Sequence, residues 1–193
     1  YDFILDKNNL YEKEGRSRIY YQMLGLSLLE LGKTKEFTDL ILKISKHKYS
    51  ELTHQKKYLT LLSLFKAQKY KDVVDGFEAL NNSTILTNNS GTRRVLSDVF
   101  YYWRARAFLE MGEYQNALNE TFRFRPVNNQ ASVGYILDHY WPKKDYIKGL
   151  AYEGLEDEIN ARRSYQDFLS VWSNADNSLP EVVDAKQKLE NLR

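Results

Sequence analysis

Three histidines are the first side chains to consider for metal binding or proton transfer: His47, His54 and His139. His47 and His54 stand seven residues apart and would share one face of a helix. No carboxylate and no third histidine has the spacing that would complete a metal site with them. His139 stands apart from both, in an aromatic segment. We therefore expect these histidines to bind no metal and to perform no catalysis.

Acidic side chains gather in one place, where a pair of carboxylates could act as general acid and base: Glu153, Glu156, Asp157 and Glu158. An acid beside the first turn of a helix more commonly stabilises the positive end of the helix dipole. The sequence also has no cysteine, no glycine-rich phosphate loop and no nucleophile elbow. We predict that the chain is not an enzyme, has no catalytic residue and uses no cofactor.

Arginines recur in pairs that could contact phosphate groups: Arg16 and Arg18, Arg93 and Arg94, Arg104 and Arg106, Arg123 and Arg125, Arg162 and Arg163. However, 28 Lys and Arg residues are balanced by 26 Asp and Glu residues, and the net charge is only +2. Residues 1–80 hold 14 basic and 11 acidic side chains, and residues 81–193 hold 14 and 15. Because neither half has a large positive excess, the sequence does not favour a nucleic-acid partner.

The composition predicts that helices carry these side chains. The chain has 9 Gly and 3 Pro among 193 residues, whereas average usage of about 7% and 5% would give about 13 and 10. Tight turns are therefore few, which favours long helices with short connections. A hydrophobic content of 42% with 28% charged residues is typical of a folded globular protein. We predict an all-α fold.

The sequence gives few signals of cellular location. No stretch approaches the roughly 20 apolar residues that a membrane helix needs, so we predict no membrane span. The lack of cysteine excludes disulfides but is compatible with a cytoplasmic or an extracytoplasmic protein. The chain starts at Tyr1, without Met and without a signal-peptide pattern. We expect it to be a piece of a longer protein and leave the localisation unassigned.

An internal repeat organises the chain. Residues 29–32 and 109–112 share a Leu-Glu-apolar-Gly pattern, which is typical of a helix closed by a glycine. Two further turns have another residue, Gln68 or Glu156, in place of the glycine. The four turn residues are 36, 44 and 44 positions apart, which suits a repeat of about 34 residues with insertions: Gly32, Gln68, Gly112 and Glu156.

Residues at fixed distances from these turns share their type. Small residues stand five positions before each turn: Ser27, Ser63, Ala107 and Ala151. Mostly small residues also stand seven positions before it: Gly25, Leu61, Ala105 and Gly149. Small side chains at these places let a second helix approach closely. Apolar residues follow the turn at offsets that make one face of that second helix: Phe37, Ile41 and Ile44; Val73, Phe77 and Leu80; Ala117, Thr121 and Phe124; Ala161, Tyr165 and Phe168.

These segments resemble the tetratricopeptide repeat, a helix-turn-helix unit. The nearest matches are Gly112-Glu113-Tyr114 with Ala117, and Gly149-Leu150-Ala151-Tyr152 with Ala161 and Tyr165. The resemblance covers roughly residues 18–172. It departs from the family at the turn residues Gln68 and Glu156, and at Arg104 and Lys148, which occupy a column that is usually apolar. The resemblance implies helical hairpins stacked in a right-handed superhelix with a concave binding groove.

The resemblance divides the chain into repeats within one domain over residues 1–193. We expect repeat units at about 18–50, 54–81, 98–125 and 142–172, with insertions at 81–94 and 125–144. A cap follows at 178–193, where Ser178 and Glu181 form a capping box around Pro180. Its apolar stripe is formed by Val182, Ala185, Leu189 and Leu192. This end of the chain resembles the end of tetratricopeptide regions attached to bacterial signalling proteins.

One further column points, by the geometry of the family, from the first helix of each repeat into the groove. It lies ten residues before the turn and is mostly tyrosine, a rigid amphipathic side chain that recognition surfaces favour. The alternative is that the column contains tyrosine by chance, because the chain has 15 tyrosines. Arg106 stands four residues after one of these tyrosines. The predicted partner-binding residues are Gln22, Tyr58, Tyr102, Arg106 and Tyr146.

The function predicted from this pattern is that of a non-catalytic scaffold, which holds a protein or peptide segment in its groove. One alternative is a regulatory or sensor module of a bacterial signalling protein, in which the array acts on a missing domain of the same polypeptide. Another is an extracytoplasmic scaffold that binds glycans or envelope proteins. The column lacks the Lys and Asn residues with which the family holds acidic chaperone tails.

Overall fold

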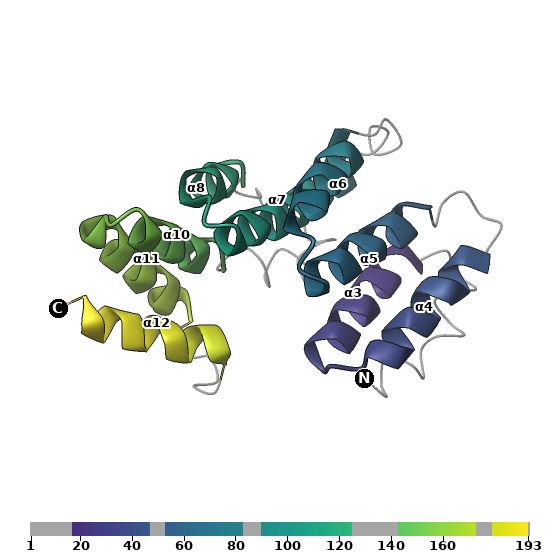
Figure 1. Ribbon diagram of the computed structural model, residues 1–193, viewed down its shortest axis with the longest axis horizontal. Coiled ribbons are helices and arrows are strands. Elements are labelled where there is room, and N and C mark those ends of the chain that lie inside the picture. The colour runs from purple at the N-terminus through teal and green to yellow at the C-terminus, as the bar shows by residue number, and fades with distance from the viewer. Residues whose placement is uncertain (1–16, 47–52, 83–89, 125–142, 173–178, 193) are drawn as a thin grey trace. The chain divides into compact units, whose positions relative to one another are not determined.

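The computed structural model describes residues 17–46, 53–82, 90–124, 143–172 and 179–192 (Figure 1). In these ranges the chain forms nine α-helices and no strand, so the prediction of an all-α fold is confirmed. The helices are α3 (Ser17–Glu30), α4 (Thr34–Lys46), α5 (Thr53–Lys66), α6 (Tyr70–Asn82), α7 (Ser90–Glu110), α8 (Tyr114–Phe122), α10 (Lys143–Gly154), α11 (Glu158–Val171) and α12 (Pro180–Asn191). No helix in this part of the chain combines the length and the apolar character that a membrane span requires.

All four predicted turn residues adopt the left-handed backbone conformation. Their φ angles are 66° for Gly32, 59° for Gln68, 72° for Gly112 and 60° for Glu156. After Gly32, Gly112 and Glu156 the amide of the next residue bonds back to the preceding helix, as Glu113 N does to Phe108 O at 2.9 Å. This is the bond with which a left-handed residue closes a helix and satisfies its last carbonyl groups. The predicted equivalence of the four turns is confirmed, although only two of them have glycine.

The predicted inner faces of the second helices are confirmed at most positions; the exceptions are Ile41, which is partly exposed while Leu40 is buried, and Phe124, which is buried beyond the end of α8. Phe37 and Ile44 of α4, Val73 and Phe77 of α6, and Ala161 and Phe168 of α11 are all at most 3% exposed. In α8 the same face has Ala117 and Thr121, both buried. Burial of one stripe at spacings of three and four is what holds an amphipathic helix in place.

The chain divides into two compact units, at residues 1–68 and 69–193. In unit 1, helices α3, α4 and α5 all contact one another. A Cβ added at Gly25 would collide with the side chain of Leu59, so this small residue allows α3 and α5 to lie close together. One continuous array over residues 1–193 stays a prediction.

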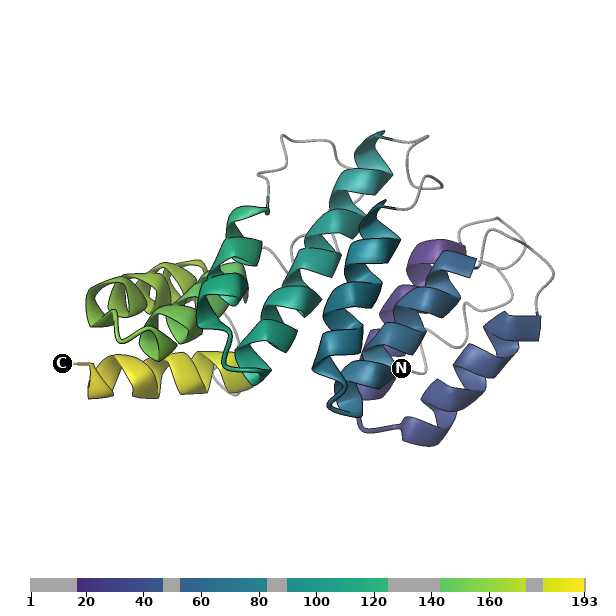
Figure 2. The same cartoon turned by 45° about the horizontal axis from the view of Figure 1, so that its top comes forward.

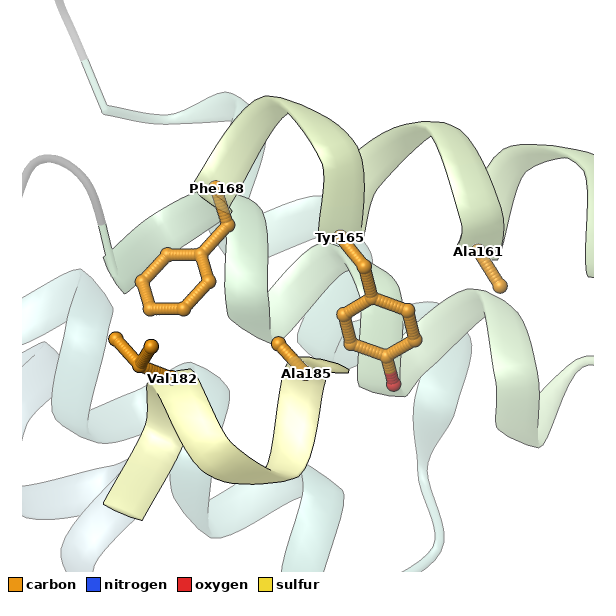
Figure 3. Close-up of a cluster of buried hydrophobic side chains, with 5 residues drawn as sticks. All are labelled: Ala161, Tyr165, Phe168, Val182 and Ala185. Atoms are coloured by element: carbon orange, nitrogen blue, oxygen red, sulfur yellow. The ribbon is translucent and has the colours of Figure 1, made fainter. Parts of the chain in front are cut away.

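In unit 2, each of α7, α8, α10 and α11 contacts the next helix that the structure describes, α6 contacts α7, and α10 contacts α7 as well (Figures 1 and 2). Tyr165 lies against Gly149, where an added Cβ would overlap its ring. At the end of the chain, Val182 and Ala185 of α12 pack on Tyr165 and Phe168 of α11 (Figure 3). The predicted apolar stripe of the cap is therefore confirmed.

Two boundaries differ from the predicted ones. Helix α7 begins at Ser90, inside the predicted insertion 81–94, so the helix is longer than the repeat pattern indicated. Helix α12 begins at Pro180 with Leu179, not Ser178, as its N-cap, and no side chain caps it. The predicted capping box is therefore wrong, because the N-cap is Leu179, which has no side-chain oxygen, and Glu181 is the second residue of the helix rather than the third. Most of the insertion at 125–144 lies outside the described residues.

Candidate functional site

The five predicted groove residues have different environments. Gln22 and Tyr58 belong to unit 1 and are buried there, at 5% and 1% exposure. Tyr102 in unit 2 is also buried, at 4%. Arg106 of α7 and Tyr146 of α10 are both partly exposed. Partner binding by this column stays a prediction, and its accessible members are Arg106 and Tyr146.

Arg106 lies among aromatic and acidic side chains. Its guanidinium carbon is 5.3 Å from the ring centroid of Trp103 and 5.9 Å from that of Tyr102, within the range of cation–π attraction. Burial would lower the pKa of Arg106, but interactions with Tyr102, Glu110 and Glu181 outweigh it and raise that pKa. The side chain is therefore a lasting cation that lies against two aromatic rings of α7.

Tyr146 links α10 to α12. Its hydroxyl donates a hydrogen bond to Asp184 Oδ2 at 2.7 Å, and its ring centroid is 5.3 Å from that of Phe168. Burial and the bond to the Asp184 carboxylate raise the pKa of Tyr146, whereas the positive charge of Arg106 acts to lower it. Tyr146 and Arg106 are therefore close enough for their charges to interact, although they come from different helices.

Two more polar links join the same pair of helices. Lys143 Nζ donates to Glu181 Oε1 at 2.7 Å, and Lys188 Nζ donates to both oxygens of Glu153 at 2.9 and 3.0 Å. Burial would raise the pKa of Glu181, but the hydrogen bond and charge of Lys143 lower it. Glu153 also accepts a hydrogen bond from the Tyr165 hydroxyl at 2.7 Å. This acid, which the sequence places in a possible catalytic cluster, instead connects α10, α11 and α12.

A second charged cluster joins α6, α7 and α8. Arg104 is paired with Glu78 and, at 3.2 Å, with Glu120, and Arg123 lies 3.1 Å from Glu120. Burial raises the pKa of Glu120 more than the two arginines lower it. For Glu78, burial is outweighed by a hydrogen bond from Asn82 and by both arginines, and its pKa is lowered.

This cluster explains one departure from the repeat pattern. Arg104 stands in a column that is usually apolar, yet it is only 7% exposed because two carboxylates neutralise its charge. Arg123 is also engaged, with Glu78, Glu120 and the ring of Tyr101, whose centroid is 4.3 Å away. These two members of the arginine pairs hold helices together. Sequence reasoning missed Glu78 and Glu120, which are separated from Arg104 by 26 and 16 positions.

The other departure, Lys148, is paired locally. Its Nζ lies 3.0 Å from Asp145 Oδ1 and 5.6 Å from the ring centroid of Phe122. Asp157, from the acidic cluster at 153–158, caps α11 by accepting from the Asn160 amide at 3.1 Å. Hydrogen bonds from the side chain and backbone of Asn160 lower the pKa of Asp157. The acid thus has the helix-capping role that the sequence favoured.

No metal-binding cluster is found in the part of the chain that the structure describes, and the absence of catalysis stays a prediction. This part of the chain contains no group of three His, Asp or Glu residues that could hold an ion. His47 and His139 lie outside the described residues, and the side chain of His54 does too. The candidate site is the polar surface that α10 forms with α7 on one side and α12 on the other. In comparisons with known proteins, no family model, no curated protein and no solved structure matches the chain.

Proposed function

We propose that the chain is a scaffold of tetratricopeptide type, whose hairpins stack in a right-handed superhelix and whose first helices bind a segment of a protein partner. Several features support this assignment. The turns at Gly32, Gln68, Gly112 and Glu156 share one backbone conformation, and the same face of each second helix is buried. Small residues lie where helices approach, as Gly149 does against Tyr165.

The observation that carries the binding proposal is that α7 and α10 contact each other and that Arg106 of α7 and Tyr146 of α10 are both partly exposed. These two helices are the first helices of neighbouring repeats. Arginine and tyrosine are the side chains most often found where binding energy is concentrated. Together they offer a fixed cation, a phenol hydroxyl and apolar ring surface, which suits carboxylates and apolar side chains of a protein segment.

The experiment selects ligands for this surface. Peptides of about 15 residues with an amphipathic helical pattern are selected from a displayed library on the full chain, and their Kd is measured by calorimetry. Arg106→Gln should weaken the selected peptides at least tenfold, which corresponds to about 1.4 kcal/mol. Tyr146→Phe, which removes only the hydroxyl, should weaken them by a smaller factor.

The matched control is Arg162→Gln, because Arg162 is an exposed arginine on α11. It should leave the affinity unchanged. Circular dichroism and thermal unfolding establish that each variant keeps its fold before binding is measured. Failure to select any peptide, or binding that is lost in Arg162→Gln but kept in Arg106→Gln, would contradict the proposal.

A further inference from the structure

Helix α12 makes two kinds of contact with its neighbours. Toward α11 it presents Val182 and Ala185, which are 2% and 0% exposed and lie against Phe168 and Tyr165 (Figure 3). Charged side chains of α12 make its hydrogen bonds to α10, where Lys143, Tyr146 and Glu153 are the partners: Glu181, Asp184 and Lys188. The two faces of α12 therefore have different chemistry.

The charged residues of α12 follow a helical spacing. Glu181, Asp184 and Lys188 stand at positions i, i+3 and i+7, so they lie along one face of the helix. Val182 and Ala185 form the adjoining apolar stripe. Helix α12 is thus an amphipathic helix with two carboxylates one turn apart beside an apolar edge.

These two carboxylates engage the residues proposed to bind a partner. Asp184 accepts the hydroxyl hydrogen bond of Tyr146 at 2.7 Å. Glu181 binds Lys143 at 2.7 Å and interacts electrostatically with Arg106. A cation of this surface, Lys143, and the phenol of Tyr146 therefore already hold an acidic segment, which comes from the chain itself.

We propose that α12 is an internal occupant of the binding surface, and that the partner is an acidic amphipathic helix with two carboxylates one turn apart, which takes the place of α12. This inference rests on the proposed function, because it names the chemistry of the partner for the same surface. We expect the partner helix to bind α10 through the same contacts that α12 makes, in which Glu181 binds Lys143 and Asp184 binds Tyr146.

The attachment of α12 is of a kind that a competing helix can replace. Its links to α10 are partly exposed: the side chains of Lys143 and Glu181 are 11% and 25% exposed, and those of Lys188 and Glu153 are 23% and 39%. Ion pairs in contact with water contribute little each, about 0 to 1 kcal/mol. Only Val182 and Ala185 of α12 are fully buried among the described residues. A helix that offers the same groups satisfies the same partners.

The covalent connection gives α12 an advantage over any free helix. A segment tethered by a short linker acts at an effective concentration on the order of millimolar. A free peptide with the sequence of α12 should therefore bind the unchanged chain weakly. It should bind much better once the tethered copy is weakened by substitutions that the peptide does not carry.

The test uses a fluorescent peptide of residues 179–192 and the full chain. Fluorescence anisotropy measures its Kd for the unchanged chain, for Glu181→Gln with Asp184→Asn, and for Glu190→Gln. The double variant should bind the peptide at least tenfold more tightly than the unchanged chain. Glu190 is an exposed carboxylate of the same helix, so Glu190→Gln is the matched control and should give no gain. A peptide carrying the double substitution itself should not bind.

Lys143→Gln with Tyr146→Phe in the double variant should abolish the gain, because these α10 groups are the binding partners of the peptide. If the double variant fails to fold, as shown by circular dichroism, Asp184→Asn alone removes one link and should give a smaller gain in the same direction. Equal peptide affinity for folded variants and unchanged chain, or a gain that persists without Lys143 and Tyr146, would overturn the inference.

The outcomes also separate this inference from the proposed function. If library peptides depend on Arg106 but weakening α12 changes nothing, the scaffold function stands and the internal occupant is wrong. If the α12 peptide binds as expected but no library peptide depends on Arg106, the proposed binding surface fails and only an exchange of α12 between copies of the chain is left. Size-exclusion chromatography with light scattering identifies that exchange as a dimer.

Discussion

Replacing Gly149 by alanine should destabilise unit 2, although alanine is the better helix former. A Cβ at this position would overlap the ring of Tyr165, with Cζ at 2.8 Å and Cε1 closer still. The ring cannot move aside easily, because it is fully buried and its hydroxyl is bonded to Glu153 at 2.7 Å. The substitution therefore tests whether close approach of α10 and α11 depends on a missing side chain.

The expected magnitude is the difference between two opposing terms. Forcing extra atoms into a packed core costs about 1 to 3 kcal/mol, and replacing glycine by alanine within a helix returns about 1 kcal/mol. Because burial and the hydrogen bond to Glu153 hold the Tyr165 ring in place, the cost of the extra atoms should lie near 3 kcal/mol, the upper end of about 1 to 3 kcal/mol. We expect a net loss of about 2 kcal/mol, which corresponds to a fall in Tm of about 4 to 8 °C for a chain of this size.

Thermal and urea unfolding followed by circular dichroism measure this loss. Tyr165→Leu provides the second arm of a double-mutant cycle, because it removes the ring that the new methyl group meets. Adding Gly149→Ala to Tyr165→Leu should cost nothing or stabilise the chain. If Gly149→Ala alone is as stable as the unchanged chain, the ring gives way and the packing argument is wrong.

The remaining predictions concern packing, backbone strain and ionisation. Ala151→Leu should destabilise by about 1 to 3 kcal/mol in urea unfolding, because Ala151 is 0% exposed at the contact between α8 and α10; an unchanged midpoint would contradict this. Gly112→Ala should lower the free energy of unfolding by about 1 kcal/mol through its φ of +72° alone, since an added Cβ meets nothing within 4 Å. Gln68→Gly should raise the free energy of unfolding, because Gln68 has a φ of 59°. Burial, followed by bonds to carboxylates, raises the pKa of Tyr146 and Tyr165, so their stabilisation is complete below the unfolded pKa of about 10 and is lost as the pH rises above it. Tyr165→Phe should therefore lose stability less steeply than the unchanged chain between about pH 10 and 11.5, and parallel curves would refute this.

Local rules explain why the turns and the buried faces could be predicted. A left-handed residue that closes a helix is set by the few residues around it, so Glu156 could be recognised as a turn by its place after the same pattern as Gly112. Periodicity of three and four likewise places Val73 and Phe77 on one buried face without knowledge of what covers it. Both signals depend only on nearby sequence.

The polar links could not be predicted in the same way. Tyr146 and Asp184 are 38 positions apart, and Glu78 and Arg123 are 45 apart. Whether such groups meet depends on which helices are neighbours and at what rotation, and neither is encoded in a single helix. Arg104 stands out in the sequence as a charged residue in a column that is usually apolar. Its partners Glu78 and Glu120 have no sequence signal that separates them from exposed acids.

The tyrosine column shows why a shared position does not give a shared role. Tyr102 and Tyr146 stand at the same place relative to their turns, yet Tyr102 is 4% exposed and Tyr146 is partly exposed. The surroundings of Tyr146 include α11, which supplies Phe168, and α12, which supplies Asp184. Position relative to the turn therefore indicates which face of its helix a tyrosine lies on, whereas its exposure depends on the distant helices that pack against it.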